Sequence, residues 1–529
     1  MNESEPQVQS AAQAGSTGEA AGVGAAVGGV RSNGDSNWLD LWALSPEMRA
    51  YLKTARRDAA CSHADSRREG AGDGPQGIAT PAKLRHLQET LYRKAKAEPG
   101  YRFWSLYGEL KRRDLLEHAL RLVVRNGGAP GVDGESLTHI TATPGNQARW
   151  LDTLQREISD QTYRPAPVRR VYIPKGNGGQ RPLGIPTVKD RVVQMAALLV
   201  VGPIFEADFH PRSYGFRPGR NAHQAVDEIV QAIRSGRLEV VDADLSKYFD
   251  TIPHDRLMKL VARRTSDGSL LHLIRQWLDA PVVEENGNVL PNRQGVPQGG
   301  VISPLLANLY LNALDWAVND PAQRGQPVLV RYADDFVILC GPGQGQALCQ
   351  RLRRWLSARG LQLNEEKTRL ADSRQGFDFL GFRVRWQRAR VSRRWYVHVE
   401  ASPRSQQRLR DAARRKLNHW TLGERIPEVI AGLNRLLRGW SGYFHYRQSS
   451  RTMGKLNWHV RQRVRRWLCA STGRSMDSGA TTPTNACMGS TACGVCHNPS
   501  RQPPDERANR MPRDEATRKA GYGKPVRPV

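Results

Sequence analysis

The chain has 529 residues, and its 79 lysines and arginines against 51 aspartates and glutamates give a formal net charge of +28. This excess of positive charge indicates a polyanionic partner, for which nucleic acid is the usual one. No apolar run approaches the roughly 20 residues of a membrane-spanning helix, and seven scattered cysteines do not suggest a disulfide framework. We therefore expect a cytoplasmic protein that binds nucleic acid, and not a membrane protein.

The N-terminal part divides into a leader and a helical segment. Residues 1–80 are expected to form a flexible leader, because their Gly-, Ala- and Ser-rich beginning offers too little apolar surface for a core. Apolar residues then follow helical spacing, with Leu84, Leu87 and Leu91 on one face. Residues 81–150 are therefore predicted to be a helical N-terminal extension that leads into the next domain.

Residues 151–385 alternate short strand-like runs with helical ones. The runs VRRVYIPK and RPLGIP flank the glycine-rich GNGG and predict a β-hairpin. The run LEVVDADL at 238–245 and the runs VLVRY and FVILC within 328–340 have the composition of strands. Strands interleaved with helices predict an α/β or α+β domain whose sheet is backed by helices.

The C-terminal part changes in character. Residues 401–467 contain sixteen lysines and arginines against three acidic residues, and the apolar residues from Ile426 to Phe444 recur at a period of about 3.6. We therefore predict an all-α domain at 401–468 whose charge suits a phosphate backbone. Residues 469–529 are rich in Ser, Thr, Gly and Pro and are expected to have little stable structure.

Two adjacent carboxylates interrupt the strand-forming run VRYADDFVIL. Asp334 and Asp335 repel each other when ionised, and a divalent metal is a common partner for such clusters. A second source of carboxylates is VVDADLSKYFD, where Asp242 and Asp244 would face one side of a strand and Asp250 lies beyond its end. A tight turn at the Asp-Asp pair would bring both runs together in a two-metal phosphoryl-transfer site. The alternative is a solvated hairpin turn, which is the commoner role of an isolated Asp-Asp pair.

The surroundings of these carboxylates resemble a known family. YADD between apolar strands is similar to the metal-binding hairpin of reverse transcriptases, and DADLSKYFDTIPH is similar to that family's other palm strand. The blocks IPKGNGGQRPLGIPTVKDRVVQ, SYGFRPGRNAHQA, GVPQGGVISPLLANLYLN, GLQLNEEKTRL and FDFLGF occur in the order of its finger and palm blocks. GAPGVDG and LNRLLRGWSGYF narrow the resemblance to bacterial group II intron-encoded proteins.

The resemblance implies an architecture and a metal site. The fold would be an α+β right-hand polymerase with fingers and palm at 151–385, followed by an all-α thumb and maturase domain. Metals are implied at Asp244 and Asp334, with the carbonyl of Leu245 as a further ligand and Asp335 close beside. The three aspartates are thus the implied catalytic residues, and two Mg²⁺ ions are the implied cofactors.

The same resemblance implies contacts with the incoming nucleotide. Phe249 corresponds to the aromatic residue under the nucleotide sugar, where a rigid ring excludes a 2′-hydroxyl and selects deoxynucleotides. Lys175 and Arg181 flank the glycine turn and would close on the triphosphate, whose charge needs cations. Gln298 would meet the nucleotide, and Lys367 would contact primer or nucleotide. Without the resemblance, Phe249 is a core residue and the three cations are solvated surface residues.

The helical domain is implied to act as thumb and as intron-binding surface. Arg435, Arg438 and Arg447 are candidates for contacts with RNA phosphates, whereas Trp440 is expected in the core. The implied function is an RNA-directed DNA polymerase that also binds its group II intron RNA to promote splicing and supports retrohoming. The implied partners are intron RNA, a DNA target and primer, and dNTPs, in the bacterial cytoplasm and at the nucleoid when on DNA. A homodimer is compatible with this function.

The tail departs from the pattern of many group II proteins, which end in a DNA-binding segment and an HNH endonuclease with paired CxxC motifs. Cys487, Cys493, Cys496 and His497 supply one CxxC, and the second CxxC and the HNH catalytic set are absent from the sequence. We therefore expect no complete endonuclease at 469–529 and no zinc site. Priming would then need another route, such as a nascent strand at a replication fork.

Two other functions stay open. One is a maturase that acts only as an RNA-binding splicing factor, without catalysis. The intact set of Asp244, Asp334, Asp335 and Phe249 favours an active polymerase over it. The other is a reverse transcriptase outside group II introns, of the retron or defence type, against which LNRLLRGWSGYF argues.

Overall fold

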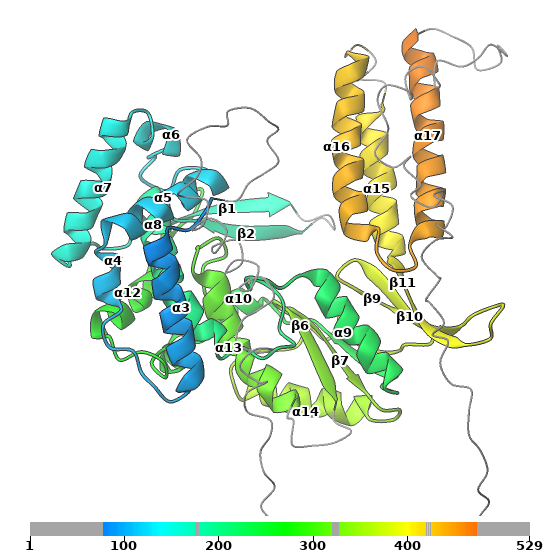
Figure 1. Ribbon diagram of the computed structural model, residues 1–529, viewed down its shortest axis with the longest axis horizontal. Helices are drawn as coiled ribbons and strands as arrows, with labels where there is room; N and C mark the ends of the chain where they lie inside the picture. Colours follow the sequence, from blue (N-terminus) through cyan, green and yellow to red (C-terminus); the bar gives the residue numbers. More distant parts are fainter. Residues whose placement is uncertain are drawn as a thin grey trace, which may run out of the picture.

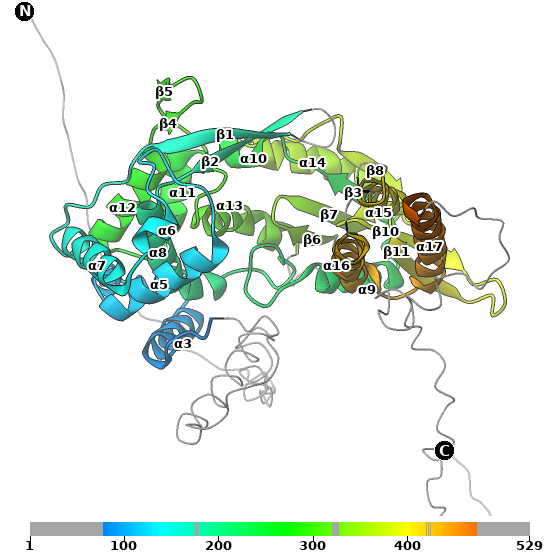
Figure 2. The same ribbon diagram turned by 90° about the horizontal axis from the view of Figure 1, so that it is seen from above.

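The computed structural model describes most of the chain between residues 78 and 472. The described residues are 78–174, 179–319, 327–418, 421, 423 and 425–472. The leader up to residue 77, Lys175 and the tail from residue 473, with its cysteines, lie outside this part. Figures 1 and 2 show the N-terminal helices and the palm in one mass, with a helical bundle at the opposite end.

The N-terminal helices pack around one buried helix. Helix α8 (Val188–Glu206) is apolar on nearly all sides and is buried along most of its length, so it forms the centre of this layer. Helices α3 and α5 pack directly against it. Helix α4 also contacts α8, whereas α7 packs on α5 and α6 packs on α7. The helices of this part are α3 (Ala82–Ala97), α4 (Tyr107–Leu110), α5 (Arg113–Asn126), α6 (Leu137–Ile140) and α7 (Pro144–Ser159).

The fingers carry a small sheet of strand order β2-β1-β4-β5. Strands β1 (Val168–Pro174) and β2 (Gln180–Ile185) form the antiparallel hairpin that the sequence predicts around the glycine turn. Strands β4 (Val282–Val283) and β5 (Val289–Leu290) extend it on the β1 side. In Figure 1 the β1–β2 hairpin reaches from the N-terminal helices toward the C-terminal bundle.

The palm sheet has the strand order β6-β7-β3-β8, with antiparallel neighbours throughout. Its strands are β3 (Glu239–Ala243), β6 (Val328–Tyr332), β7 (Asp335–Cys340) and β8 (Arg369–Asp372). Strands β6 and β7 are almost entirely buried, as their Val-, Ile- and Leu-rich sequences predict.

Helices cover the palm sheet. Helix α9 packs on β6 and β7, α13 packs on β6, and α14 packs on β3. The helices of the palm are α9 (Ala222–Arg234), α10 (Tyr248–Thr251), α11 (His254–Val261), α12 (Gly268–Asp279), α13 (Ser303–Val318) and α14 (Gly345–Ser357). The expectation of an α+β fold with a helix-backed sheet is confirmed.

A third sheet connects the palm with the bundle. Strands β9 (Phe377–Phe379), β10 (Phe382–Arg388) and β11 (Trp395–Ala401) lie in the order β11-β10-β9. The sequence analysis assigned no structure between residues 386 and 400. Its palm boundary at 385 falls in the middle of β10.

The C-terminal bundle consists of α15 (Pro403–Lys416), α16 (Ile426–Phe444) and α17 (Ser450–Thr472). Helix α15 begins where β11 ends, because the Ser402 side chain caps it and Pro403 occupies its first turn. The apolar stripe predicted on α16 faces the bundle core, and Trp440 is partly buried against that core. No helix in the described ranges is long and apolar enough to cross a membrane.

Candidate active site

The Asp-Asp pair lies at the turn of the β6–β7 hairpin. Tyr332 pairs with Asp335, so Ala333 and Asp334 form a two-residue turn and Asp335 is the first residue of β7. Ala333 has a φ of +60°, the left-handed conformation that favours tight hairpin turns. The turn therefore carries Asp334 alone at its tip, whereas the sequence analysis placed both aspartates in it.

Asp244 directly follows β3 and lies next to this turn. Strand β3 pairs with β7 so that Ala243 faces Phe336, and the same register continued by one residue places Asp244 beside Asp335. The N–H of Asn364 donates to the carbonyl of Asp244 at 2.8 Å and fixes its backbone. The aspartates predicted to bind metal therefore converge at one end of the palm sheet.

The ionised form of these carboxyl groups is disfavoured. Removal from water raises the pKa of Asp335 to about 6, and repulsion from Asp334 and Asp244 adds to the rise. Burial likewise raises the pKa of Asp242 to about 6, with further repulsion from Asp335 and Asp244. The pKa of Asp334 is also raised, chiefly by burial. A group of partly desolvated like charges is stabilised by a bound cation.

Two basic side chains face these carboxylates. The Nζ of Lys367 donates to Oδ2 of Asp244 at 2.9 Å. Arg181, exposed on β2, opposes the burial-driven rise in the pKa of Asp334 and of Asp335. Lys367 therefore does not pair with the glutamates beside it in sequence. It lies instead at the end of the sheet, with Arg181 on the fingers side.

The donor set fits Mg²⁺. Within the part of the chain that the structure describes, no three carboxylate, imidazole or thiol side chains form a metal cage. Mg²⁺ does not need one, since it takes one or two carboxylates together with substrate phosphates. The bridge between Leu245 and Leu363 uses the carbonyl of Asp244 and the N–H of Ser246, so it leaves the Leu245 carbonyl unused. That carbonyl could join Asp244 and Asp334 as a ligand.

Phe249 and the PQGG loop are joined through the backbone. The N–H of Val296 donates to the carbonyl of Phe249 at 2.6 Å. The Phe249 ring is partly buried and contacts the Tyr248 ring edge-on. On the other side of the loop, the N–H of Gly184 in β2 donates to the carbonyl of Gln298 at 2.6 Å. The loop therefore connects the ring beneath the predicted sugar site with the fingers hairpin.

Gly299 permits this connection. Its φ is +118°, and a Cβ at this position would lie 2.2 Å from the carbonyl oxygen of Gly184. Any side chain here would separate the loop from the fingers hairpin. Backbone hydrogen bonds thus connect Phe249 and Gln298 to the fingers hairpin that carries Arg181, while Lys175 falls outside the described residues.

A buried ion pair lies behind the catalytic turn. Arg331 of β6 and Asp315 of α13 are fully buried, and the Nε of Arg331 lies 2.8 Å from Oδ1 of Asp315. The Nη1 of Arg331 also donates to Oδ1 of Asn308 at 2.7 Å and to the carbonyl of Ala333 at 2.9 Å. The buried ion pair therefore anchors Ala333, the residue with left-handed backbone that comes directly before Asp334.

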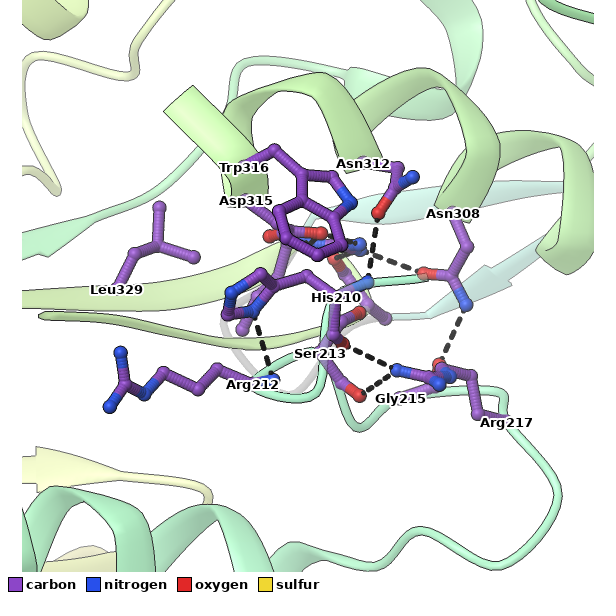
Figure 3. A network of polar contacts seen from close by, with 12 residues as sticks. His210, Arg212, Ser213, Gly215, Arg217, Asn308, Asn312, Asp315, Trp316 and Leu329 are labelled. Carbon is purple, nitrogen blue, oxygen red and sulfur yellow. Dashed lines mark hydrogen bonds and ion pairs between the residues drawn. The ribbon is translucent and has the colours of Figure 1, made fainter. Parts of the chain in front are cut away.

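Asn308 extends this anchor to the SYGFR segment, as Figure 3 shows. Its Nδ2 donates to the carbonyl of Gly215 at 2.7 Å. A Cβ on Gly215 would lie 2.2 Å from the backbone nitrogen of Ala333, so the two backbones are in direct contact. The sequence analysis gave no role to Arg331, Asp315 or Asn308. The available signal was polar residues inside the apolar runs VLVRY and LANLYLNALD.

The arginines predicted to contact RNA lie in two environments. Arg435 and Arg438 are exposed on α16, and Arg435 lines an open groove together with basic residues of α15. Arg447 forms an ion pair with Asp227 of α9. Arg447 therefore links the bundle to the palm, while the other two face solvent.

Two family models match consecutive parts of the chain. Residues 173–384 match the model described as reverse transcriptase (RNA-dependent DNA polymerase), and residues 404–478 match the group II intron maturase-specific domain. The chain belongs to the group II intron reverse transcriptase/maturase family. It is an RNA-directed DNA polymerase by family, with the maturase domain placed after the polymerase domain.

Relatives of this reverse transcriptase come from bacteria and from eukaryotic organelles. Protein YkfC of Escherichia coli (strain K12) is 37% identical over 345 residues, which are 58% of this chain and 90% of YkfC. Group II intron-encoded protein LtrA of Lactococcus lactis subsp. cremoris is 36% identical over 214 residues, 40% of this chain and 35% of LtrA. Nuclear intron maturase 1, mitochondrial, of Arabidopsis thaliana is 27% identical over 241 residues, 34% of this chain and 32% of that protein.

Proposed function

We propose that this reverse transcriptase copies RNA into DNA at the end of the palm sheet, with Asp244 and Asp334 as Mg²⁺ ligands and Asp335 beside them. The convergence of these carboxylates with Arg181 and Lys367 carries the proposal. Two Mg²⁺ ions bound there would activate the primer 3′-hydroxyl and stabilise the leaving pyrophosphate. The reaction joins the 3′-oxygen to the α-phosphorus and breaks the bond to pyrophosphate. Primer extension on an RNA template tests it.

The protein's own cations prepare the site for the triphosphate. Arg181, on β2 of the fingers hairpin, supplies charge for the phosphate oxygens, and so does Lys175, which precedes the glycine turn in the sequence. Lys367 neutralises part of the Asp244 charge before substrate arrives and then contacts the nucleotide or primer. Gln298 meets the nucleotide, since its backbone is bonded to the same hairpin that carries Arg181.

Replacing Phe249 by valine is expected to admit ribonucleotides. The smaller side chain leaves room for a 2′-hydroxyl, so the ratio of kcat/KM for dNTP to that for rNTP should fall by at least about tenfold. Single-nucleotide incorporation with matched dNTP and rNTP measures this ratio. Phe249→Tyr keeps the ring and serves as the matched control. If wild type and both variants discriminate equally between dNTP and rNTP, Phe249 does not lie at the nucleotide sugar.

We further propose that the bundle binds the chain's own intron RNA and promotes splicing by stabilising the folded RNA, and that the enzyme supports retrohoming. The basic groove between α15 and α16 supports this, because it presents positive charge to solvent. The proposed partners are intron RNA, DNA target and primer, and dNTPs. The proposed location is the bacterial cytoplasm, with association to the nucleoid when the protein is bound to DNA.

Two substitutions in this groove are expected to change the affinity for RNA in opposite directions. Arg435→Ala removes one phosphate contact, so the slope of log affinity against log salt should become shallower by about 0.7 to 0.9. Glu428→Gln removes the acidic side chain that lines the same groove, so affinity should rise. Filter binding of the intron RNA at several salt concentrations measures both. Identical slopes for wild type and Arg435→Ala would exclude the groove as the RNA site.

A further inference from the structure

The β10–β11 hairpin has no part in the functions described above. Residues 385–403 fall between the two ranges that the family models match. Figures 1 and 2 both show the hairpin projecting past α17, on the side of the molecule away from the N-terminal helices. The part between Arg385 and Trp395 is called the arginine hairpin below.

The arginines of this hairpin lack acidic partners. Residues 383–396 contain six arginines and no aspartate or glutamate. Arg383, at the base, pairs with Asp378 at 3.3 Å. Five others are exposed, and none of them forms an ion pair with a described residue: Arg385, Arg388, Arg390, Arg393 and Arg394. Like charges gathered at one tip repel each other, and a polyanion relieves that repulsion.

The tip that carries these charges is a bonded turn. The N–H of Ala389 donates to the carbonyl of Arg394 at 2.8 Å, and the N–H of Arg393 donates to the carbonyl of Ala389 at 3.1 Å. The Nε of Arg388 donates to the carbonyl of Arg393 at 2.6 Å. The turn therefore holds several cations in one place, and the guanidinium of Arg388 is hydrogen-bonded to its backbone.

A stacked tryptophan pair lies beside the charged tip. In the β10–β11 register, Trp386 pairs with Val397 and Arg388 pairs with Trp395. Both indoles therefore lie on the same face of the hairpin as Val384, which is buried in the core nearer the base of the hairpin. Their rings stack at a centroid distance of 5.7 Å and an angle of 14°, and Trp395 is 53% exposed. An exposed indole among arginines is a platform on which a nucleobase stacks.

We propose that the arginine hairpin is a binding site for a single-stranded polynucleotide. Arg390, Arg393 and Arg394 bind its phosphates, and a base stacks on Trp395. Charge alone would suit any nucleic acid, but an exposed aromatic face recognises unpaired bases, which a duplex does not offer. The inference rests on the proposed function only in taking nucleic acid as the partner. The site lies on the β11-β10-β9 sheet and not on the palm sheet beside the aspartates, so it would hold a segment of a strand that is not being copied at that moment.

The experiment compares full-length variants with wild type in anisotropy titrations of short labelled single strands, RNA and DNA of one sequence. Excess unlabelled primer–template duplex occupies the proposed polymerase site at the end of the palm sheet. The triple variant R390A/R393A/R394A is expected to bind at least about tenfold more weakly at low salt, with a salt slope shallower by about 2, since each phosphate contact contributes about 0.7 for a single strand. W395A is expected to lose about tenfold in affinity with an unchanged slope.

Three controls keep the result specific. R383A removes an arginine of the same sheet that is already paired with Asp378, and it should bind as wild type does. The triple lysine variant at 390, 393 and 394 should keep the salt slope. Primer extension on a short template should be unchanged in the triple alanine variant.

A triple alanine variant with wild-type affinity and slope would overturn the proposal. A larger loss for RNA than for DNA identifies RNA as the strand, and equal losses identify a site that accepts both sugars. If wild type fails to extend primers, the proposed polymerase function is wrong. The titrations still show whether the arginine hairpin binds a single strand.

Discussion

Asp334→Asn is expected to reduce primer extension on an RNA template by about a thousandfold. The substitution removes a negative charge from the proposed Mg²⁺ site, and the proposed reaction needs that ion to stabilise charge on the reacting oxygens. The turn itself should survive, because its anchor is the bond from Arg331 to the carbonyl of Ala333, which does not involve the Asp334 side chain. The loss should therefore appear in kcat and not in the affinity for primer–template.

Asp242→Asn is the matched control for this experiment. The pKa of Asp242 is raised by burial, to about 6, but Asp242 lies within β3, paired with Val337 and Arg369, and not at the end of the sheet. It should keep most of the activity. An equal loss in both variants would contradict the assignment of Asp334 as a ligand. Absence of extension by wild type would favour the RNA-binding maturase without catalysis, and splicing of the cognate intron would then be the next assay.

The strands of the palm could be predicted because their signals are local. The runs VLVRY and FVILC are apolar and β-branched, and the Asp-Asp pair between them marks a turn. The convergence of the aspartates is not local. Asp244 lies beside Asp335 only because β3 is placed between β7 and β8 in the sheet. Periodicity does not encode strand order, so the sequence analysis supposed this convergence from the chemistry of clustered carboxylates, and the family resemblance supported it.

The features that the sequence analysis missed are those that depend on tertiary partners. Arg331 is one charge in an apolar strand, and its partner Asp315 lies sixteen positions earlier, on a helix. A pattern of residue types does not show that the two side chains meet in the core. The β10–β11 hairpin was missed for a different reason. Arg383 and Arg385 alternate with Val384 and Trp386 as a half-buried strand requires, but the family blocks used in the sequence analysis end with FDFLGF, and the palm boundary was placed at 385, within this strand.

Asp315→Asn is expected to lower the free energy of unfolding by about 3–5 kcal/mol, because it leaves the fully buried guanidinium of Arg331 without a counter-charge. The shift of the urea midpoint in the unfolding of the full chain measures the effect. Glu365→Gln is the matched control, since its pair with Arg353 is exposed, at 59% and 45% of the two side chains. That change should leave the urea midpoint nearly unchanged, because solvent screens an exposed ion pair. Equal costs in the two variants would contradict the burial argument.

The double variant Asp315→Leu/Arg331→Met separates stability from positioning. Replacing both charges by apolar side chains removes the unpaired cation, so much of the lost stability should return. In this double variant the hydrogen bond from Arg331 to the Ala333 carbonyl is absent, so the left-handed backbone at Ala333 has no anchor. Primer extension should therefore remain slow in kcat although the protein is stable. Full recovery of kcat would mean that the buried pair only stabilises the palm and does not position Asp334.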